Sequence, residues 1–568
     1  MINPWRACAL MSMLVLAACG GGGGGGGGGS GNDWLTFSPT PLNVSAVDHL
    51  SQTFQVSAHS SRVISQQLYV KIVDSSGVID GNVQIDPSAE DSQTIVTTLE
   101  TSPTLQAGSY KGSFAVWLYT DAAMTQVYDG SPWNVPYDIE VAPRHADHRI
   151  FADRQAVALA AFPTTGKSRL TGSIRLQDNQ GLSTPWAASS DQSWLTVTAS
   201  GKVGDGTPLT VSADPASLPV DSLSIATITI TSGGTSIAAP EIVRVGVWKS
   251  STDPTSHVTA VPYAALVADP LRPYVYGLSP NVGGQNNAMI DVVNVYTGAV
   301  VARIAPDQHD GVGSQVSAMA VSGDGKRLYV GENAVQVGIY DLETQTFSRT
   351  VAANVRYGSL DFERFGVLRV DGHELLVTND GDVVDLDTGR SVASLISTFP
   401  SHPIMHWDAY RSQLYAVDSG ASPGLTKSWS VDWIDRDGGS ALFTALQTRA
   451  LPAMYWEGGG LSPDGSVLYA GNGSFDAQTL AATSGAVPRT DPVGGGMLYQ
   501  IRVGPDGRRY VYYVTGSLYV YAADGTQLVR EDVPPNEDLL PAAVSSDGVV
   551  VALIHDVGVT PTVELRAF

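Results

Sequence analysis

The chain has 568 residues and a formal net charge of −23, because 55 aspartates and glutamates outnumber 32 lysines and arginines. A surface this acidic repels nucleic acid and anionic membrane surfaces, so we expect no nucleic-acid partner. The length exceeds that of one domain, and the 60 glycines favour strands and turns over helices. The composition therefore predicts an all-β protein of several domains.

Residues 1–18 have the features of an export signal. Arg6 supplies the positive charge, residues 7–16 form an apolar run, and small residues precede Cys19. The run is too short to span a bilayer comfortably. Residues 16–19, Leu-Ala-Ala-Cys, resemble the lipobox of bacterial lipoproteins. That resemblance implies cleavage before the cysteine, a lipid on Cys19, and attachment to a membrane outside the cytoplasm.

Ten glycines at residues 20–29 predict a flexible tether, which we place at residues 19–32. Glycine rather than aspartate after the cysteine resembles the outer-membrane class of lipoproteins, facing the periplasm or the cell surface. The alternative is an ordinary cleaved signal with an incidental cysteine. Cys8 lies within the signal, so the mature chain would keep Cys19 alone, and its lipid leaves no thiol for a disulfide, a metal or catalysis.

Residues 33–143 predict an immunoglobulin-like β-sandwich. Apolar and polar residues alternate with period two in four runs, at residues 54–56, 68–73, 110–118 and 137–141. Turn residues separate these runs, as is typical of a sandwich. Residues 105–112 resemble the entry to the penultimate strand of immunoglobulin-like domains. We expect Trp117 and Trp133 to pack in the core or cover strand ends, with a binding platform as the alternative.

Residues 149–250 predict a second sandwich. Four segments resemble the BACON family, an immunoglobulin-like module first noted beside carbohydrate-active enzymes: residues 186–198, 200–201, 209–214 and 226–232. The chain departs from the family at Ser224 and Ile225, where an arginine is usual. Trp186 and Trp194 fall at packing positions of the family, so we expect a spacer, with carbohydrate contact as the alternative.

Residues 253–568 contain seven copies of one repeat. In each copy a polar turn, often Asp-Gly, precedes an apolar strand, and the copies start near residues 271, 322, 370, 408, 462, 504 and 545. From Tyr276 to Ala552 the mean spacing is 46 residues, which is typical of a β-propeller. We expect the turn glycines to adopt positive φ angles, which gives the aspartates a structural role rather than metal ligation.

These repeats resemble the YVTN-type propellers, close to the lactonase-like and quinoprotein-like groups. The resemblance implies a seven-bladed β-propeller after the two immunoglobulin-like β-sandwiches. Ring closure requires both ends of the domain to share one blade, which removes exposed strand edges. We therefore expect residues 257–261 to pair with residues 563–568.

Candidate binding residues precede the repeats, in segments that border the channel mouth of a propeller. Aromatic rings beside a carboxylate suit stacking on a ring with hydrogen bonds to hydroxyls, whereas packing between blades is the alternative. The candidates are Arg356, Tyr357, His406, Trp407, Tyr455, Trp456 and Glu457.

No motif assigns a catalytic residue. The sequence has no Gly-x-Ser-x-Gly elbow, phosphate loop or dinucleotide fingerprint, and we predict no cofactor. Pro403 between His402 and His406 argues against a helical metal pair, and residues 307–310 are predicted to be a solvated loop. We therefore predict no metal site.

The combined hypothesis is a non-catalytic cell-envelope lipoprotein. One partner is the membrane, which the protein binds through the lipid on Cys19. The other is a protein or glycan, recognised by the propeller, which the two sandwiches carry as a stalk. The alternative is an envelope enzyme, a hydrolase or lactonase-like, acting on a sugar or small molecule at the channel mouth. Propellers host many functions, so the fold alone does not choose between the two.

Overall fold

Strands form nearly all of the regular structure, and the helical element among the described residues is a 3-10 turn at Thr165–Lys167. The prediction of an all-β protein is confirmed. The computed structural model describes residues 12–14, 34–62, 64, 66–87, 93–145, 147–233, 237–259, 261, 263, 265–279, 289–306, 318–333, 336–353, 365–396, 403–418, 425–435, 438–450, 457–470, 473–483, 487–488, 491–495, 498–534, 538–556 and 562–568. Its contacts divide the chain into two units, residues 1–146 and 147–568.

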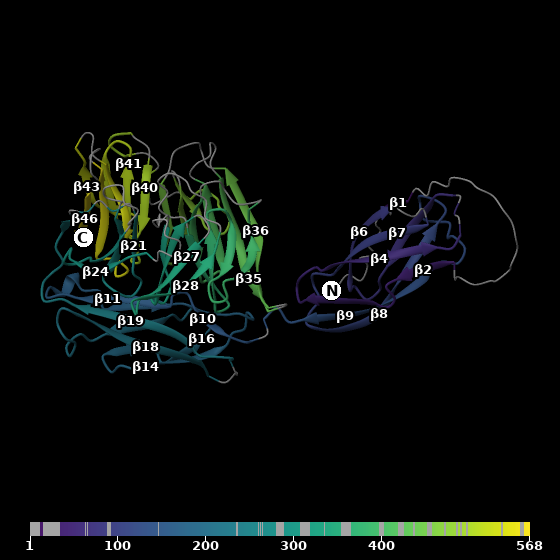
Figure 1. Ribbon diagram of the computed structural model, residues 1–568, viewed down its shortest axis with the longest axis horizontal. Helices are drawn as coiled ribbons and strands as arrows, with labels where there is room; N and C mark the ends of the chain where they lie inside the picture. The colour runs from purple at the N-terminus through teal and green to yellow at the C-terminus, as the bar shows by residue number, and fades with distance from the viewer. Residues whose placement is uncertain are drawn as a thin grey trace. The chain divides into compact units, whose positions relative to one another are not determined.

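The first unit contains two sheets (Figure 1), with a large hydrophobic cluster and a smaller one that includes Trp34 and Trp133. One sheet has the order β1 (Ser12–Leu14), β5 (Leu68–Val73), β8 (Gly108–Tyr119), β9 (Trp133–Ala142) and β3 (Leu42–Val47). The other has the order β2 (Leu35–Ser38), β4 (Thr53–Ser60), β7 (Thr94–Thr101) and β6 (Ile79–Pro87). Strict alternation in β9 buries every second side chain. Trp133 packs in this unit's interior, edge-on to Trp34 at 5.2 Å between ring centroids.

The second unit starts with a further set of sheets at residues 147–250, called the second sheet pair below. Its larger sheet has the order β11 (Ala156–Ala161), β19 (Glu241–Lys249), β18 (Ser222–Ser232), β14 (Pro185–Ser190) and β16 (Ser200–Lys202). Facing it are β12 (Thr171–Ile174), β17 (Leu209–Ala213) and β15 (Leu195–Val197), with β10 (Ile150–Ala152) paired to β13 (Leu176–Asp178). Trp186 is 1% exposed and packs in the core between these sheets, so its ring has no free face for a sugar.

The remaining sheets, residues 253–568, are called the ring below. Four of them contain four consecutive strands each. The first two sheets are β21 (Ala265–Ala268), β22 (Tyr274–Ser279), β23 (Met289–Asn294) and β24 (Val300–Ile304), and then β25 (Ala318–Val321), β26 (Arg327–Asn333), β27 (Gln336–Asp341) and β28 (Thr346–Ala352). The next two sheets are β29 (Phe365–Val370), β30 (His373–Thr378), β31 (Asp382–Asp385) and β32 (Ser391–Ser394), and then β33 (Pro403–Asp408), β34 (Gln413–Asp418), β35 (Leu425–Ile434) and β36 (Ser440–Ala450).

Two further sheets complete the described part of the ring. The first has the order β39 (Gly473–Asp476), β38 (Val467–Ala470), β37 (Glu457–Leu461), β40 (Leu498–Val503), β41 (Arg509–Tyr513), β42 (Ser517–Tyr521) and β43 (Gln527–Asp532). The second has the order β20 (His257–Thr259), β46 (Thr562–Ala567), β45 (Val550–Asp556) and β44 (Asp538–Val544). In this second sheet His257 lies opposite Leu565. The predicted pairing between the two ends of the repeat region is therefore confirmed over His257–Thr259.

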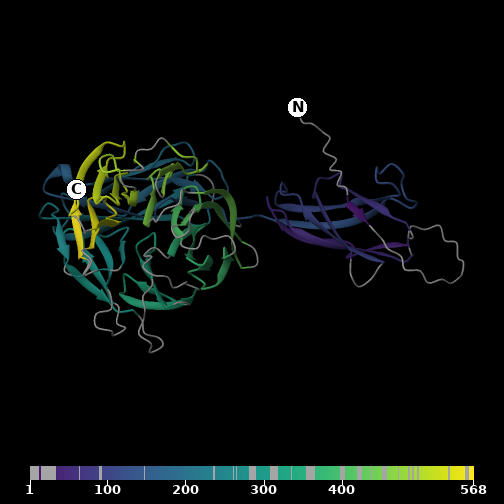
Figure 2. The same cartoon turned by 90° about the horizontal axis from the view of Figure 1, so that it is seen from above.

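The strands that open the described repeats contact one another in a closed circle (Figure 2). The order around this circle is β21, β25, β29, β33, β37, β40, β44 and back to β21. These strands are called the inner strands below. Hydrophobic clusters fill the space between neighbouring sheets, so each sheet buries both of its faces.

The turns after the inner strands repeat one hydrogen-bond pattern. In the turn after β25, Ser322 Oγ donates to Asp324 Oδ1 at 2.7 Å and accepts from the Arg327 amide at 2.9 Å. Gly325 in this turn has a φ of +68°, which a side chain would strain. The serine-to-aspartate bond recurs in the turns at residues 462–465 and 545–548. The predicted structural role of these aspartates and glycines is confirmed in these turns.

Candidate ligand cavity in the ring

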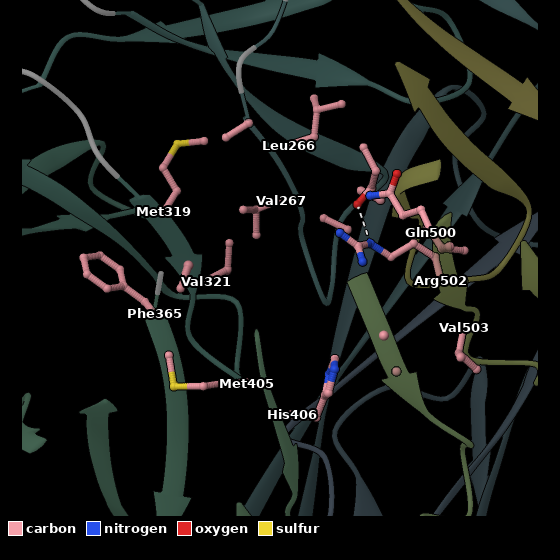
Figure 3. A pocket seen from close by; sticks show the side chains of 18 of the residues that line it. Leu266, Val267, Met319, Val321, Phe365, Met405, His406, Gln500, Arg502 and Val503 are labelled. Carbon is pink, nitrogen blue, oxygen red and sulfur yellow. Dashed lines mark hydrogen bonds between the residues drawn. The ribbon is translucent and has the colours of Figure 1, made fainter. Parts of the chain in front are cut away.

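A cavity of about 480 Å³ lies where the inner strands converge (Figure 3). Side chains or backbone from β21, β25, β29, β33, β37, β40 and β44 all contribute to its lining. Cavities that bind small organic molecules fall in this range of volume. The circle of inner strands therefore encloses a space large enough for a ligand.

The two sides of the cavity differ in chemistry. Met319, Phe365 and Met405 come from three successive inner strands and form an apolar side. Gln500 and Arg502, both from β40, lie across the open space from them (Figure 3). The lining is therefore amphipathic.

Hydrogen bonds to the backbone hold Arg502 in the cavity wall. Its Nε donates to the Ala542 carbonyl oxygen at 2.9 Å, and its Nη1 donates to the Ile501 carbonyl oxygen at 3.3 Å. The first bond crosses from β40 to the neighbouring inner strand β44. The guanidinium is thus oriented at the wall by the strands themselves.

Gln500 brings an unsatisfied acceptor to the same wall. The residue is 6% exposed, and its Oε1 accepts no hydrogen bond from any residue that the structure describes. A buried acceptor left without a partner costs about 1–3 kcal/mol. A water or a ligand that donates to this oxygen would remove that cost.

Glycines of β37 make room for neighbouring side chains in the lining. A Cβ on Gly459 would lie 2.6 Å from His406 Nε2, and a Cβ on Gly460 would lie 2.6 Å from Val503 Cγ2. Both distances are too short for real contacts, so side chains here would displace these neighbours. The glycine run after residue 457 is therefore part of the wall, and it lets the His406 imidazole reach the cavity.

Of the predicted binding residues, the structure fully describes His406 and Trp407. Both lie within the inner strand β33. His406 lines the cavity, whereas Trp407 packs against the hydrophobic cluster between the sheets of β29 and β33.

The other predicted residues lie partly or wholly outside the described part of the chain. Glu457 begins β37 and its backbone pairs with Gln500, but its side chain is outside the described residues. Cys19, Arg356, Tyr357, Tyr455 and Trp456 also lie outside the described residues, as do residues 307–310 and His402.

The sequence reasoning missed Gln500 and Arg502. Both lie in β40, at residues 498–503, where two hydrogen-bonding side chains alternate with apolar residues ahead of the turn at Gly504. Most of the other inner strands place small or apolar side chains at the cavity. Polar residues at alternate positions of one inner strand were the signal that could have identified this site.

The second sheet pair covers one end of the ring (Figure 1). Its side chains donate hydrogen bonds to the turns that follow the inner strands. Arg244 Nη1 donates to the Asp324 carbonyl oxygen at 3.1 Å, and Arg175 Nη1 donates to the Asp464 carbonyl oxygen at 2.7 Å. Asn179 Nδ2 donates to Asp371 Oδ1 at 2.8 Å. The turns that close each repeat therefore also bind the second sheet pair.

Apolar packing extends this contact around the ring. Phe162, next to β11, lies edge-on to Tyr296 of the ring at 5.1 Å between ring centroids, and both residues belong to one buried cluster. A Cβ on Gly246 of β19 would lie 2.3 Å from the Leu271 carbonyl oxygen, so the two backbones touch at this glycine. With contacts spread over successive turns, the second sheet pair lies across the end of the ring at which the inner strands finish.

Burial perturbs one carboxyl group in the ring strongly. Burial raises the pKa of Glu374, in β30, to about 7, although the Tyr329 hydroxyl donates a hydrogen bond to it. Arg327 Nη1 lies 3.5 Å from the same carboxyl group. Glu374 does not line the cavity, so its pKa bears on stability rather than on ligand binding.

Within the described ranges, no group of three or more His, Cys, Asp or Glu side chains is placed to hold a metal ion. Nor does any helix in that part of the chain have the length and apolar character needed to cross a membrane.

The fold and the cavity define a class: an all-β protein in which a circle of inner strands surrounds a ligand-sized, amphipathic cavity. No family model matches the chain, and no curated protein matches it. Among solved structures, the chain is similar to one from "Crystal Structure of Mitotic Checkpoint Complex", with 16% identity and a TM-score of 0.39. That match covers 55% of this chain and 93% of the other.

Proposed function

We propose that the chain is a cell-envelope lipoprotein in which a seven-bladed β-propeller recognises a ligand of the envelope, presented by a protein or a glycan. The closed circle of inner strands supports the propeller, and so does the pairing of β20 with β46, which puts both ends of the ring into one sheet. The lipobox-like sequence at residues 16–19 supports the lipid anchor.

In this proposal the two sheet pairs are immunoglobulin-like sandwiches, the second of the BACON type. Residues 19–32 and the first sandwich form the stalk. The second sandwich has a task beyond spacing, because its hydrogen bonds to the repeat turns attach it to the propeller and close one end of the channel. The ligand then enters from the opposite end.

The observation that carries the proposal is the amphipathic lining of the cavity. Apolar walls that exclude water, with a few hydrogen-bonding groups that set orientation, are what small ligand sites have in common. Gln500 and Arg502 supply those groups on one side, and Met319 and Phe365 face them. This arrangement favours recognition of a ligand group of defined shape.

Blocking the cavity tests this function. The whole chain carrying Cys19→Ser, which needs no detergent, would be used to capture ligands from glycan arrays and envelope extracts. Ala320→Trp would fill the cavity, because Ala320 lines it, whereas Ala302→Trp on the exposed outer strand β24 is the matched control. We expect Ala320→Trp to lose captured ligands that Ala302→Trp retains.

Two results would contradict the proposal. One is equal capture by both tryptophan variants, which would place recognition outside the cavity. The other is hydrolysis of small esters or lactones by the parent chain without any captured ligand, which would favour the envelope enzyme.

The anchor has a separate test. Cys19→Ser should release the protein from the membrane fraction, and unchanged fractionation would contradict lipidation. Cleavage after Ala18 would also remove β1 and leave β5 at the edge of its sheet. Mass spectrometry of the mature N-terminus would measure both the cleavage and the acyl chains.

A further inference from the structure

We propose that the cavity receives an uncharged, apolar group that carries one hydroxyl, such as a phenol. This inference rests on the proposed ligand-binding function and names the chemical class of its ligand. Two features support it: the apolar side of the cavity, and the unsatisfied acceptor of Gln500 on the opposite side.

The apolar side selects the body of the ligand. Met319, Phe365 and Met405 come from β25, β29 and β33, and they line the side of the cavity opposite Gln500 (Figure 3). Methionine side chains adapt their shape and make favourable contacts with aromatic rings. A single aromatic ring or a short alkyl chain would bury its surface there, whereas a sugar ring would leave several hydroxyls unpaired against these side chains.

Gln500 selects the hydroxyl. The residue is 6% exposed, and its Oε1 accepts no hydrogen bond from any residue that the structure describes. The last side-chain torsion of a glutamine is soft, so the carboxamide can turn this oxygen towards a ligand in the cavity. A ligand hydroxyl that donates to Oε1 removes the cost of an unpaired buried acceptor, which is about 1–3 kcal/mol. An ether of similar shape has no proton to donate and leaves that cost in place.

The charges of the lining favour an uncharged ligand. Among the described residues, no aspartate or glutamate lines the cavity, so a cation would be buried there without a counter-charge. Arg502 already donates through Nε and Nη1 to the carbonyl oxygens of Ala542 and Ile501, so we assign it to the wall and not to a ligand contact. A charged group would therefore lose its hydration without a dedicated partner, which costs far more than the burial of one hydroxyl.

Phenol and ether probes test the inference. Isothermal titration of the whole Cys19→Ser chain at pH 7 would use 4-butylphenol, its methyl ether 4-butylanisole, and the anion 4-butylbenzoate. The three probes share the apolar body and differ in the polar group. We expect the phenol to bind roughly fivefold more tightly than either of the others, as one buried hydrogen bond predicts.

Two variants assign this preference to Gln500. Gln500→Met has a side chain of similar length without an acceptor, so it should bind the phenol and the ether equally. Gln527→Met, at an exposed position of β43, is the matched control and should keep the preference of the parent. Without any ligand, Gln500→Met should also raise the midpoint of thermal unfolding, because it removes an unpaired buried acceptor.

The outcomes separate this inference from the function on which it rests. Equal binding of phenol and ether by the parent, or a preference that survives Gln500→Met, would overturn the hydroxyl class. Tighter binding of the benzoate would overturn the uncharged class. Failure of every probe to bind would overturn the inference too, with the proposed function still judged by capture with Ala320→Trp. A Gln500→Met chain that loses stability or does not fold would show that the carboxamide is satisfied in the empty cavity, which also contradicts the inference.

Discussion

Arg369 in β29 donates two hydrogen bonds to Glu241 in β19, at 2.5 and 2.9 Å. The Glu241 side chain is 4% exposed, and the Arg369 guanidinium also lies over the ring of Phe151 at 5.3 Å from its centroid. Burial opposes the charge of Arg369, but the contact with Glu241 outweighs it and raises the pKa of the guanidinium. One buried ion pair thus joins the ring to the second sheet pair.

Arg369→Met should destabilise the second unit by about 3 kcal/mol, because it leaves the Glu241 carboxylate buried without its partner. Urea unfolding at neutral pH would measure the loss. The control is Arg530→Met, since the exposed Arg530–Asp532 pair should contribute less than about 1 kcal/mol. Adding Glu241→Gln to Arg369→Met should recover part of the lost stability. Equal losses for Arg369→Met and Arg530→Met would refute the stabilising role of the Arg369–Glu241 pair.

Glu374→Gln should stabilise the protein at pH 8 and have little effect at pH 4. The folded-state pKa of about 7 lies above the ordinary value of 4.5, so the folded state binds this proton more tightly than the unfolded state. Stability is therefore lost as the pH rises from about 4.5 to 7, and the loss persists above that range. An amide never ionises and avoids a penalty of about 3 kcal/mol.

Unfolding free energies at both pH values would measure this effect. Glu140→Gln, at an exposed position of β9, is the control, and we expect it to change stability by the same small amount at each pH. A Glu374→Gln variant that loses stability equally at pH 4 and pH 8 would show that the carboxyl group is needed for its hydrogen bond with Tyr329 instead.

Gly459→Ala should destabilise the ring by about 1–3 kcal/mol through overpacking. The new Cβ would lie 2.6 Å from His406 Nε2 and 2.8 Å from the Tyr469 carbonyl oxygen, and the backbone oxygen has no rotamer by which to move away. Thermal unfolding would measure the change. Gly166→Ala is the control because a Cβ there meets no atom within 4 Å, and a similar loss for both variants would contradict the close packing at β37.

Phe162→Ala should lower the stability of the second sheet pair and the ring together, by about 3–5 kcal/mol. Phe162 is 6% exposed and shares a core cluster with Tyr296 and other ring residues, so its loss weakens both parts at once. Calorimetry should show one transition for residues 147–568 that shifts as a whole. Phe114→Ala, in the core of the first unit, should shift a different transition, and separate unfolding of the sheet pair and the ring would contradict this prediction.

Local patterns in the sequence determined the strands, the repeat turns and the pairing of the ring's ends. Strands follow from alternation with period two, as in β9, and the Asp324-Gly325 turn follows from residues that hydrogen-bond within five positions. His257–Thr259 could be paired with the last strand because a ring of repeats leaves two ends that must meet. None of these inferences required knowledge of a distant contact.

Tertiary structure alone decided which side chains share the cavity and which turns bind the second sheet pair. His406 and Trp407 are neighbours in sequence, but His406 lines the cavity whereas Trp407 joins the hydrophobic packing between sheets. Arg175 binds a turn 289 residues away, and no local pattern encodes such a contact. The sequence by itself determined the repeating parts because their causes are local, whereas the site arises where separate parts meet, and their packing in three dimensions sets it.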